Sequence, residues 1–127
     1  MLRTAAAVMR PGGRVVYVTS HQAHFSETHP VPAGYEPIAA SKLAGERALR
    51  ALAAEEDLDL RVVSGDMIEG TIIVRLLERR DPAAVEERRS HGPLPTVSEF
   101  AAAIAGAADA GKSVASTTYV GGRDYLG

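Results

Sequence analysis

The stretch Arg14-Val15-Val16-Tyr17-Val18-Thr19-Ser20 decides the fold of this chain of 127 residues. Its β-branched and aromatic residues are typical of a buried strand. Pro11-Gly12-Gly13 precedes it and ends a helix that the Ala, Leu, Met and Arg residues of Met1–Arg10 predict. The segment after it, His21–Gly34, is rich in His, Pro and Ser and is expected to form a loop.

Helical and strand patterns alternate along the rest of the chain. Helices are predicted over Pro37–Glu55, over Thr71–Arg80 and from the capping box Thr96-Val97-Ser98-Glu99 to about Ala110. Strands are predicted over Leu58–Ser64 and Ser116–Val120, and a turn is predicted over Gly65–Gly70. This alternation predicts parallel strands with helical crossovers. We therefore expect a single α/β domain over residues 1–127. It would be a three-layer, Rossmann-like part of a doubly wound domain, with helices flanking a short parallel sheet of about three strands.

The Pro37–Glu55 helix is predicted to be amphipathic, with an apolar side toward the sheet. That side carries Ile38, Ala39, Leu43, Leu49 and Leu52. Glu46, Arg47 and Arg50 are assigned to the solvent side.

The composition excludes several classes of protein. Lys plus Arg number 14 against 16 for Asp plus Glu, so the net charge is −2 and the basic excess typical of nucleic-acid binding is missing. No apolar run approaches the roughly 20 residues of a membrane span. There is no cysteine, which rules out disulfides, thiolate chemistry and cysteine-ligated metals. We expect a cytoplasmic protein with no nucleic-acid or membrane partner.

One short motif matches the phosphate-loop pattern G-x-x-x-x-G-K-S, at Gly106–Ser113. Such a loop leaves a strand and enters a helix, whereas here Phe100–Ala108 is helical in pattern and Val114–Val120 is strand-like. The pattern therefore favours a helix that ends at Gly111, with Lys112 near its carbonyl groups.

Three histidines in the expected loop raise the alternative of a metal site. His21, His24 and His29 have Glu27 between them, and imidazole and carboxylate groups are ligands for zinc or iron. Their spacing matches no common ligand pattern, so histidines that face solvent or substrate are the preferred interpretation. No metal site is predicted.

Four segments carry a more specific pattern. Gly13–Ser20 is a glycine turn and an apolar strand that ends in Thr-Ser, and Ala40-Ser41-Lys42-Leu43-Ala44 lies near the start of a helix. Arg61–Thr71 is a strand followed by a turn, and Thr118–Gly122 ends in Gly-Gly. In order and spacing these segments resemble the C-terminal half of a short-chain dehydrogenase/reductase, over nearly the whole chain.

The resemblance implies an oxidoreductase that uses NAD or NADP to reduce a carbonyl or oxidise an alcohol of a small molecule. Ser20 matches the serine that hydrogen-bonds the substrate carbonyl in that family. Lys42 matches the lysine that binds the nicotinamide ribose and lowers the pKa of a catalytic tyrosine. A phenol titrates near pH ~10 and needs a nearby cation to work at neutral pH.

The catalytic tyrosine itself is displaced. Ile38 stands four residues before Lys42, where the family has its tyrosine, and an isoleucine cannot transfer a proton. The nearest phenol is Tyr35, placed in the loop before the helix because Pro37 disfavours helical geometry at Glu36. Tyr35 is therefore the candidate proton donor, and the alternative is that it only packs.

The turn after the second strand supplies candidate nicotinamide contacts, namely Gly65, Met67, Ile68 and Thr71. Ser64-Gly65 replaces the family's Pro-Gly, and Thr71 comes later than usual, so an ordinary strand-to-helix turn is the alternative. The family's glycine-rich turn, T-G-x-x-x-G-x-G, which holds the pyrophosphate at a helix N-terminus, does not occur in the sequence.

Two functional hypotheses follow. The first is an NAD(P)-dependent oxidoreductase that is truncated, with substrate choice set by His21–Gly34 and residues 72–95. The second is a non-catalytic remnant of the family that acts as an interaction or dimerisation module. Its exposed sheet edge predicts a homo-oligomer or a partner chain that covers it.

Overall fold

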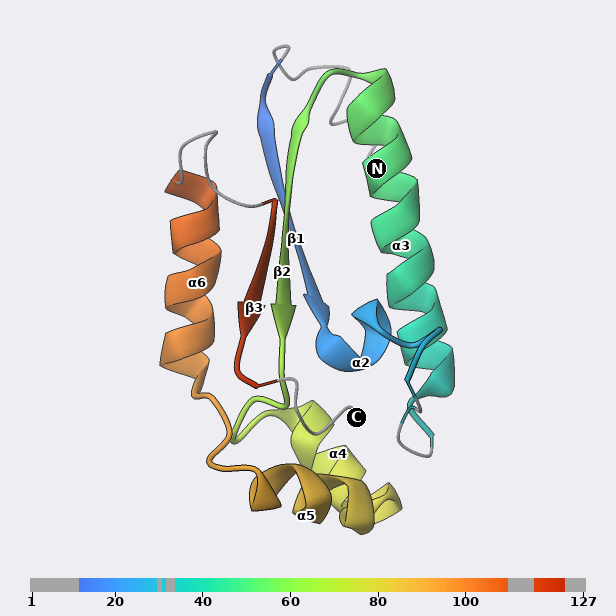
Figure 1. The fold of residues 1–127 in the computed structure, drawn as a ribbon, viewed down its shortest axis with the longest axis vertical. Coiled ribbons are helices and arrows are strands. Elements are labelled where there is room, and N and C mark those ends of the chain that lie inside the picture. The colour runs from blue at the N-terminus through green and yellow to red at the C-terminus, as the bar shows by residue number, and fades with distance from the viewer. Residues whose placement is uncertain (1–11, 30, 32–33, 110–115, 123–127) are drawn as a thin grey trace.

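The computed structural model describes residues 12–29, 31, 34–109 and 116–122 and contains a three-stranded parallel sheet (Figure 1). The elements in chain order are β1 (Arg14–Ser20), α2 (His21–His24), α3 (Glu36–Glu55), β2 (Asp59–Gly65), α4 (Ile72–Arg80), α5 (Pro82–Ser90), α6 (Val97–Asp109) and β3 (Thr117–Val120). The predicted α/β fold, a short parallel sheet flanked by helices in a Rossmann-like layout, is confirmed.

The central strand β2 pairs with both of its neighbours. Its pairing with β1 runs in register from Arg14↔Asp59 to Ser20↔Gly65, and its pairing with β3 ends at Gly65↔Val120. Because all three strands are parallel, their carboxyl ends meet at one edge of the sheet. In α/β sheets this is the edge at which ligands bind.

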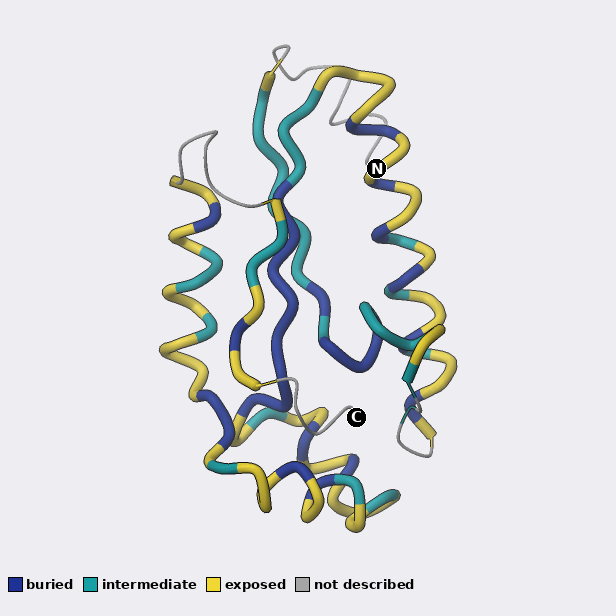
Figure 2. Tube along the Cα trace, viewed as in Figure 1, coloured by how far each residue is buried: buried dark blue, intermediate teal, exposed yellow. Residues whose placement is uncertain are grey.

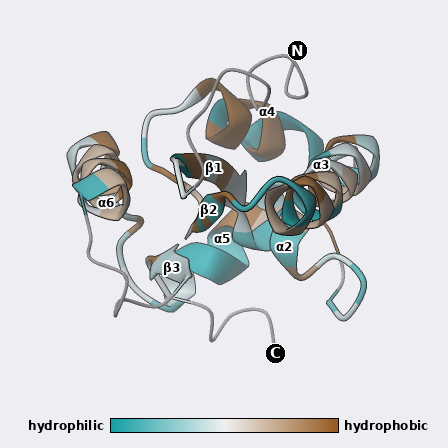
Figure 3. Ribbon diagram, turned by 90° about the horizontal axis from the view of Figure 1, so that it is seen from above, coloured by the Kyte–Doolittle hydropathy of each residue, from teal (hydrophilic) through white to brown (hydrophobic). Residues whose placement is uncertain are grey.

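Helices α3 and α6 cover opposite faces of the sheet, as the view along the strands in Figure 3 shows. On the α6 face, side chains of all three strands pack against the helix: Val16, Val63, Val120, Phe100, Ala103, Ile104 and Ala107. On the α3 face, the Tyr17 hydroxyl donates a hydrogen bond to the carbonyl of Lys42 at 2.9 Å. This alternation follows from the two-residue period of a strand.

A second apolar cluster lies beyond the carboxyl ends of the strands, where α4 and α5 cross below the sheet (Figure 2). Its buried members are Ala23, Tyr35, Ala39, Met67, Val74, Leu77, Val85 and Leu94. The two clusters are separate, so α4 and α5 form a cap on the sheet edge with a core of their own.

The expectation of a loop over residues 21–34 is wrong at its start, where His21–His24 form the one-turn helix α2. Ser20 caps this helix, because its Oγ accepts a hydrogen bond from the amide of Ala23 at 3.2 Å. The short turn has no apolar period of its own, so only the capping serine signals it.

Tyr35 lies directly before the first residue of α3, as predicted, but the expectation that Pro37 excludes Glu36 from the helix is wrong. Helix α3 begins at Glu36, with Pro37 in its first turn, and Tyr35 already has a right-handed helical backbone (φ −95°, ψ −13°). The Tyr35 carbonyl accepts the first helical hydrogen bond, from the amide of Ala39 at 2.9 Å. The restriction that proline places on its predecessor is a preference, and the first turn of a helix can override it.

Glu46 is the main correction within α3. It was assigned to the solvent side, yet it is only 4% exposed and faces α2. Its position seven residues after Ala39 and three after Leu43 puts it on the apolar side of the helix.

Helix α5 was not predicted at all, and the expected turn at Gly65–Gly70 begins one residue later, since Gly65 still pairs in β2. The other predicted bounds agree with the structure or differ by one residue. The helix predicted over Met1–Arg10 and the residues Gly111 and Lys112 lie outside the described part of the chain. Within the described residues, no helix combines the length and apolar character needed to cross a membrane.

Candidate functional site

A pocket of about 180 Å³ opens at the carboxyl edge of the sheet, between the ends of β1 and β2 and the starts of α3 and α4. All seven residues that the sequence singled out line it: Ser20, Tyr35, Lys42, Gly65, Met67, Ile68 and Thr71. The remaining lining residues are Val18, Thr19, Gln22, Asp66, Ile73, Val74, Leu77 and Phe100. Segments that are far apart in sequence are therefore brought to one site.

The polar centre of the pocket is a pair of hydroxyl groups. Ser20 Oγ and Tyr35 Oη share a hydrogen bond of 2.9 Å. Ser20 is placed by the end of β1 and by its role as the cap of α2, while Tyr35 is fixed by packing in the second cluster and is only 3% exposed. Tyr35 stands three residues before Ile38, the position at which a catalytic tyrosine was expected, and its hydroxyl nevertheless contacts Ser20.

Burial raises the pKa of the Tyr35 phenol above its ordinary value, and the hydrogen bond with Ser20 offsets this only in part. The net direction is opposite to the one that a neighbouring lysine would produce. A phenol in this state stays protonated at neutral pH, which favours proton donation over proton abstraction.

Lys42 lies on the same side of α3 as Tyr35 but two turns further along. Seven residues of α-helix correspond to a rise of about 10.5 Å. Its side chain is half-buried and lines the pocket. Ile38, between the two, packs against the second apolar cluster.

The candidate nicotinamide contacts also have structural roles. The ring of Phe100 packs directly against Gly65. A Cβ at this position would lie 2.5 Å from Phe100 Cε2, so any larger residue would displace the ring. The hydroxyl of Thr71 donates to the carbonyl of Ile68 at 2.9 Å and caps α4. Met67 and Ile68 are buried and supply apolar wall.

Asp66 is the lining residue whose role the sequence did not reveal. Its carboxylate is buried and pairs with the guanidinium of Arg88 in α5, with Arg88 Nε 2.7 Å from Asp66 Oδ2. Arg88 also donates to the carbonyls of Gly92 and Pro93. The pair attaches α5 to the end of β2, and the only signal for it was an aspartate directly after a strand.

The four groups considered for a metal site have separate partners. His21 Nδ1 lies 2.8 Å from Ser64 Oγ, and His24 Nδ1 lies 2.7 Å from Glu46 Oε1. His29 contacts the Thr28 hydroxyl, and Glu27 forms a two-point ion pair with Arg47, which lowers the pKa of the Glu27 carboxyl. No set of three potential ligands is grouped for a metal among the residues that the structure describes.

The phosphate-loop motif begins inside a helix. Gly106 and Asp109 belong to α6, whereas a phosphate loop follows a strand. The carbonyls of Ala107 and Ala108 near the end of α6 accept hydrogen bonds from the guanidinium of Arg14. The described half of the motif therefore has the arrangement of a helix end.

No protein-family model matches this chain, and neither a curated protein nor a solved structure is significantly similar to it. The family named from the sequence stays a prediction. Function has to be inferred from the pocket itself.

Proposed function

We propose that the pocket at the carboxyl edge of the sheet reduces a small carbonyl compound, or oxidises the matching alcohol, with NAD or NADP as the hydride carrier. The observation that carries this proposal is the 2.9 Å hydrogen bond between Ser20 and Tyr35, which sets two hydroxyl groups side by side in a mostly apolar pocket. Two such donors hold a carbonyl oxygen and prepare it for protonation.

The chain's residues fit the nicotinamide end of such a cofactor. A cavity of about 150 Å³ holds benzene, so a pocket of about 180 Å³ has room for one ring. Lys42 at the wall would hold the ribose, and Gly65, Met67, Ile68 and Thr71 would face the ring. The pyrophosphate has no matching glycine-rich turn in this sequence.

In the reductive direction, Ser20 donates a hydrogen bond to the carbonyl oxygen, and Tyr35 transfers its proton to the same oxygen as the alcohol forms. The bound dinucleotide supplies the hydride in this reaction. Because burial raises the pKa of Tyr35, the phenol keeps its proton at neutral pH until the negative charge that develops on the substrate oxygen draws the proton away. We therefore expect reduction to be the faster direction at neutral pH.

Titration of NADPH and NADH into the purified chain tests the proposal first. Saturable binding is expected, with strong weakening in Lys42→Met and no change in Ser41→Ala, which alters the exposed neighbouring side chain. Absence of saturable binding at millimolar cofactor would overturn the proposal for this chain.

Cofactor oxidation in the presence of a panel of small aldehydes and ketones then tests the residues. Tyr35→Phe keeps the ring in the core and removes the proton, so we expect a loss on the order of 100-fold in kcat with cofactor binding retained. Tyr17→Phe is the matched control, since Tyr17 also hydrogen-bonds but does not line the pocket. Equal activity of the two variants would assign Tyr35 to packing alone.

A specific observation also favours the second hypothesis, a non-catalytic interaction module. Helix α4 carries large apolar side chains on its surface, with Ile72 81%, Ile73 40% and Leu76 36% exposed, and Figure 3 shows hydrophobic segments of this helix in brown beside hydrophilic ones in teal. A self-association or partner-binding surface on α4 predicts a concentration-dependent mass in sedimentation experiments. Ile72→Glu would abolish it, while a monomeric protein at all concentrations would argue against self-association.

A further inference from the structure

A second group of hydrogen-bonded side chains lies outside the pocket and joins three elements of the fold. Glu46 of α3, His24 of α2 and Tyr119 of β3 form a chain, in which His24 Nδ1 lies 2.7 Å from Glu46 Oε1 and His24 Nε2 lies 3.3 Å from Tyr119 Oη. None of the three lines the pocket described above.

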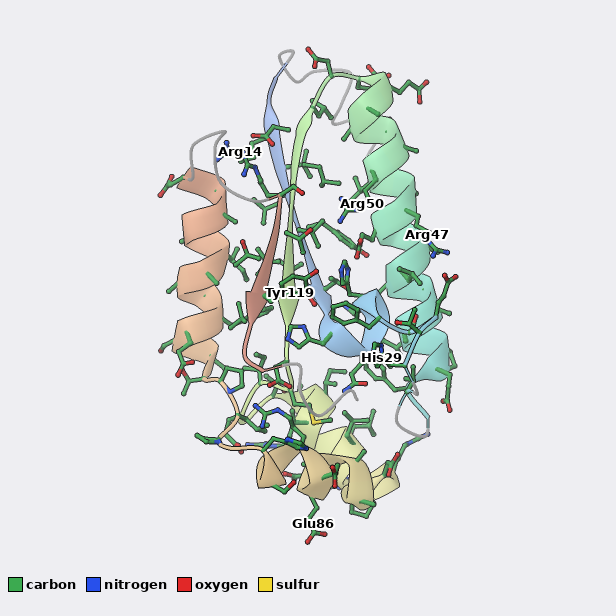
Figure 4. All side chains as sticks on the ribbon, in the orientation of Figure 1. Arg14, His29, Arg47, Arg50, Glu86 and Tyr119 are labelled. Atoms are coloured by element: carbon green, nitrogen blue, oxygen red, sulfur yellow. The ribbon has the colours of Figure 1, made fainter. Side chains whose placement is uncertain are left out.

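The chain runs from the interior to the surface. The Glu46 side chain is 5% exposed, that of His24 is 15% exposed, and Tyr119 as a whole is 37% exposed. Arg50 fixes the inner end, because its Nε donates to Glu46 Oε2 at 3.1 Å. Figure 4 labels Tyr119 on β3 and Arg50 on α3. The phenol is thus the member that solvent can reach.

The direction of the hydrogen bonds follows from the inner partner. A carboxylate oxygen only accepts, so His24 Nδ1 carries the hydrogen that is donated to Glu46. In the neutral ring with this tautomer, Nε2 carries a lone pair that accepts a hydrogen bond from the hydroxyl of Tyr119. In covalent catalysis, a nucleophile is hydrogen-bonded to a base, and a third group orients the base. Tyr119, His24 and Glu46 stand in this order.

Aromatic packing holds the phenol in place and provides an apolar surface beside it. The ring of Phe25 stacks on Tyr119, with centroids 5.8 Å apart and planes 17° apart, and meets His24 edge-on at 4.8 Å. A small hydrophobic or aromatic group can rest against this surface while its reactive atom meets Tyr119 Oη.

We propose that Tyr119, His24 and Glu46 form a second reactive site, in which the Tyr119 phenol is a nucleophile toward small activated esters. Tyr119 Oη forms a bond to the ester carbonyl carbon, and the bond from that carbon to the leaving alkoxide or phenolate breaks. The phenol proton passes to His24 Nε2 and then to the leaving oxygen. Glu46 stabilises the imidazolium formed in between, and the product is an acyl-tyrosine plus the free alcohol.

Acetylation by p-nitrophenyl acetate tests the site without any dinucleotide. We expect a burst of p-nitrophenolate and an acetyl group that mass spectrometry maps to Tyr119. Tyr119 should react on the order of 100-fold faster than N-acetyltyrosinamide in the same solution. Tyr119→Phe should remove the burst, and His24→Gln and Glu46→Gln should slow acetylation of Tyr119.

His29→Gln is the matched control, since His29 packs against Phe25 without taking part in the hydrogen-bonded chain. Circular dichroism establishes whether each variant is folded. Tyr119→Phe loses only a surface hydroxyl, so it keeps the test decisive if the variants of the more buried groups unfold. The proposal would be overturned if Tyr119 were acetylated no faster than N-acetyltyrosinamide. It would also be overturned if the rate of acetylation were the same in the native chain, in His24→Gln and in His29→Gln.

Discussion

Tyr35 has a phenol whose neutral form is favoured by the fold. Its ring is packed in the apolar cluster that α4 and α5 cover, and its hydroxyl shares a hydrogen bond with Ser20. Burial raises the pKa of this phenol. Tyr17 also has a raised pKa, because of burial and the nearby charge of Glu46. Both tyrosines therefore couple proton loss to unfolding.

This coupling predicts the stability of the protein in alkali. Above pH ~10 the unfolded chain loses the tyrosine protons while the folded chain keeps them, so the unfolded state binds fewer protons and the free energy of unfolding falls as the pH rises. Below pH ~10 neither state has lost the proton and the full stability is present. Urea unfolding at a series of pH values measures this slope.

Tyr35→Phe should make the alkaline slope shallower, and Tyr35→Phe with Tyr17→Phe should make it shallower still. Phenylalanine keeps the packing and removes the titrating group. A slope unchanged in both variants would mean that the two phenols titrate alike in the folded and unfolded chains.

At the level of the helices, α3 approaches the sheet closely at one glycine. A Cβ at Gly45 would lie 2.7 Å from Tyr17 Oη, the atom that donates to the Lys42 carbonyl. Gly106 of α6 is exposed and has no atom within 4 Å of such a Cβ. The two glycines therefore differ only in what surrounds them.

Replacing each glycine by alanine should have opposite effects. Gly106→Ala gains helix propensity and should raise the free energy of unfolding by up to about 1 kcal/mol. Gly45→Ala gains the same propensity but forces Tyr17 aside, and crowding of this kind costs about 1–3 kcal/mol. Thermal and urea unfolding of the two variants measure the difference. Equal stabilisation by both would contradict the close contact between α3 and β1.

The elements with a strong local pattern could be predicted from the sequence, and the others could not. β1 was predicted with its observed bounds because its β-branched run is long and bounded by glycine and a capping serine. Helix α5 was missed because its buried residues are only Val85 and Arg88, too few to give an apolar period. Arg88 is held inside by Asp66, a contact 22 residues away in sequence that no local pattern shows.

The same reasoning explains the candidate sites. Parallel strand ends must meet, so Ser20 and the Gly65–Thr71 turn could be expected at one edge, and Tyr35 was reached by proximity to Lys42 in sequence. The group of Glu46, His24 and Tyr119 could not be predicted, because a glutamate on a helix is solvent-exposed unless something distant pairs with it. Only the folded chain brings α2 and β3 to that position.

The described part of the molecule has two separate apolar clusters. The sheet with α6 forms one apolar cluster, and the cap of α4 and α5 forms another around Tyr35 and Met67. The buried pair of Asp66 and Arg88 connects the cap to the strand end. At the other end of the sheet, Asp59 pairs with Arg14 and Arg61 near the surface.

Breaking the buried pair of Asp66 and Arg88 should therefore destabilise α4 and α5 more than the sheet. Asp66→Asn leaves the Arg88 guanidinium buried without its carboxylate, which costs about 3–5 kcal/mol. Hydrogen exchange should then accelerate in α4 and α5 more than in β2, whose Val62, Val63 and Ser64 are fully buried. Asp59→Asn is the matched control and should leave exchange in α4 and α5 unchanged. A uniform acceleration in Asp66→Asn would mean that cap and sheet unfold as one unit.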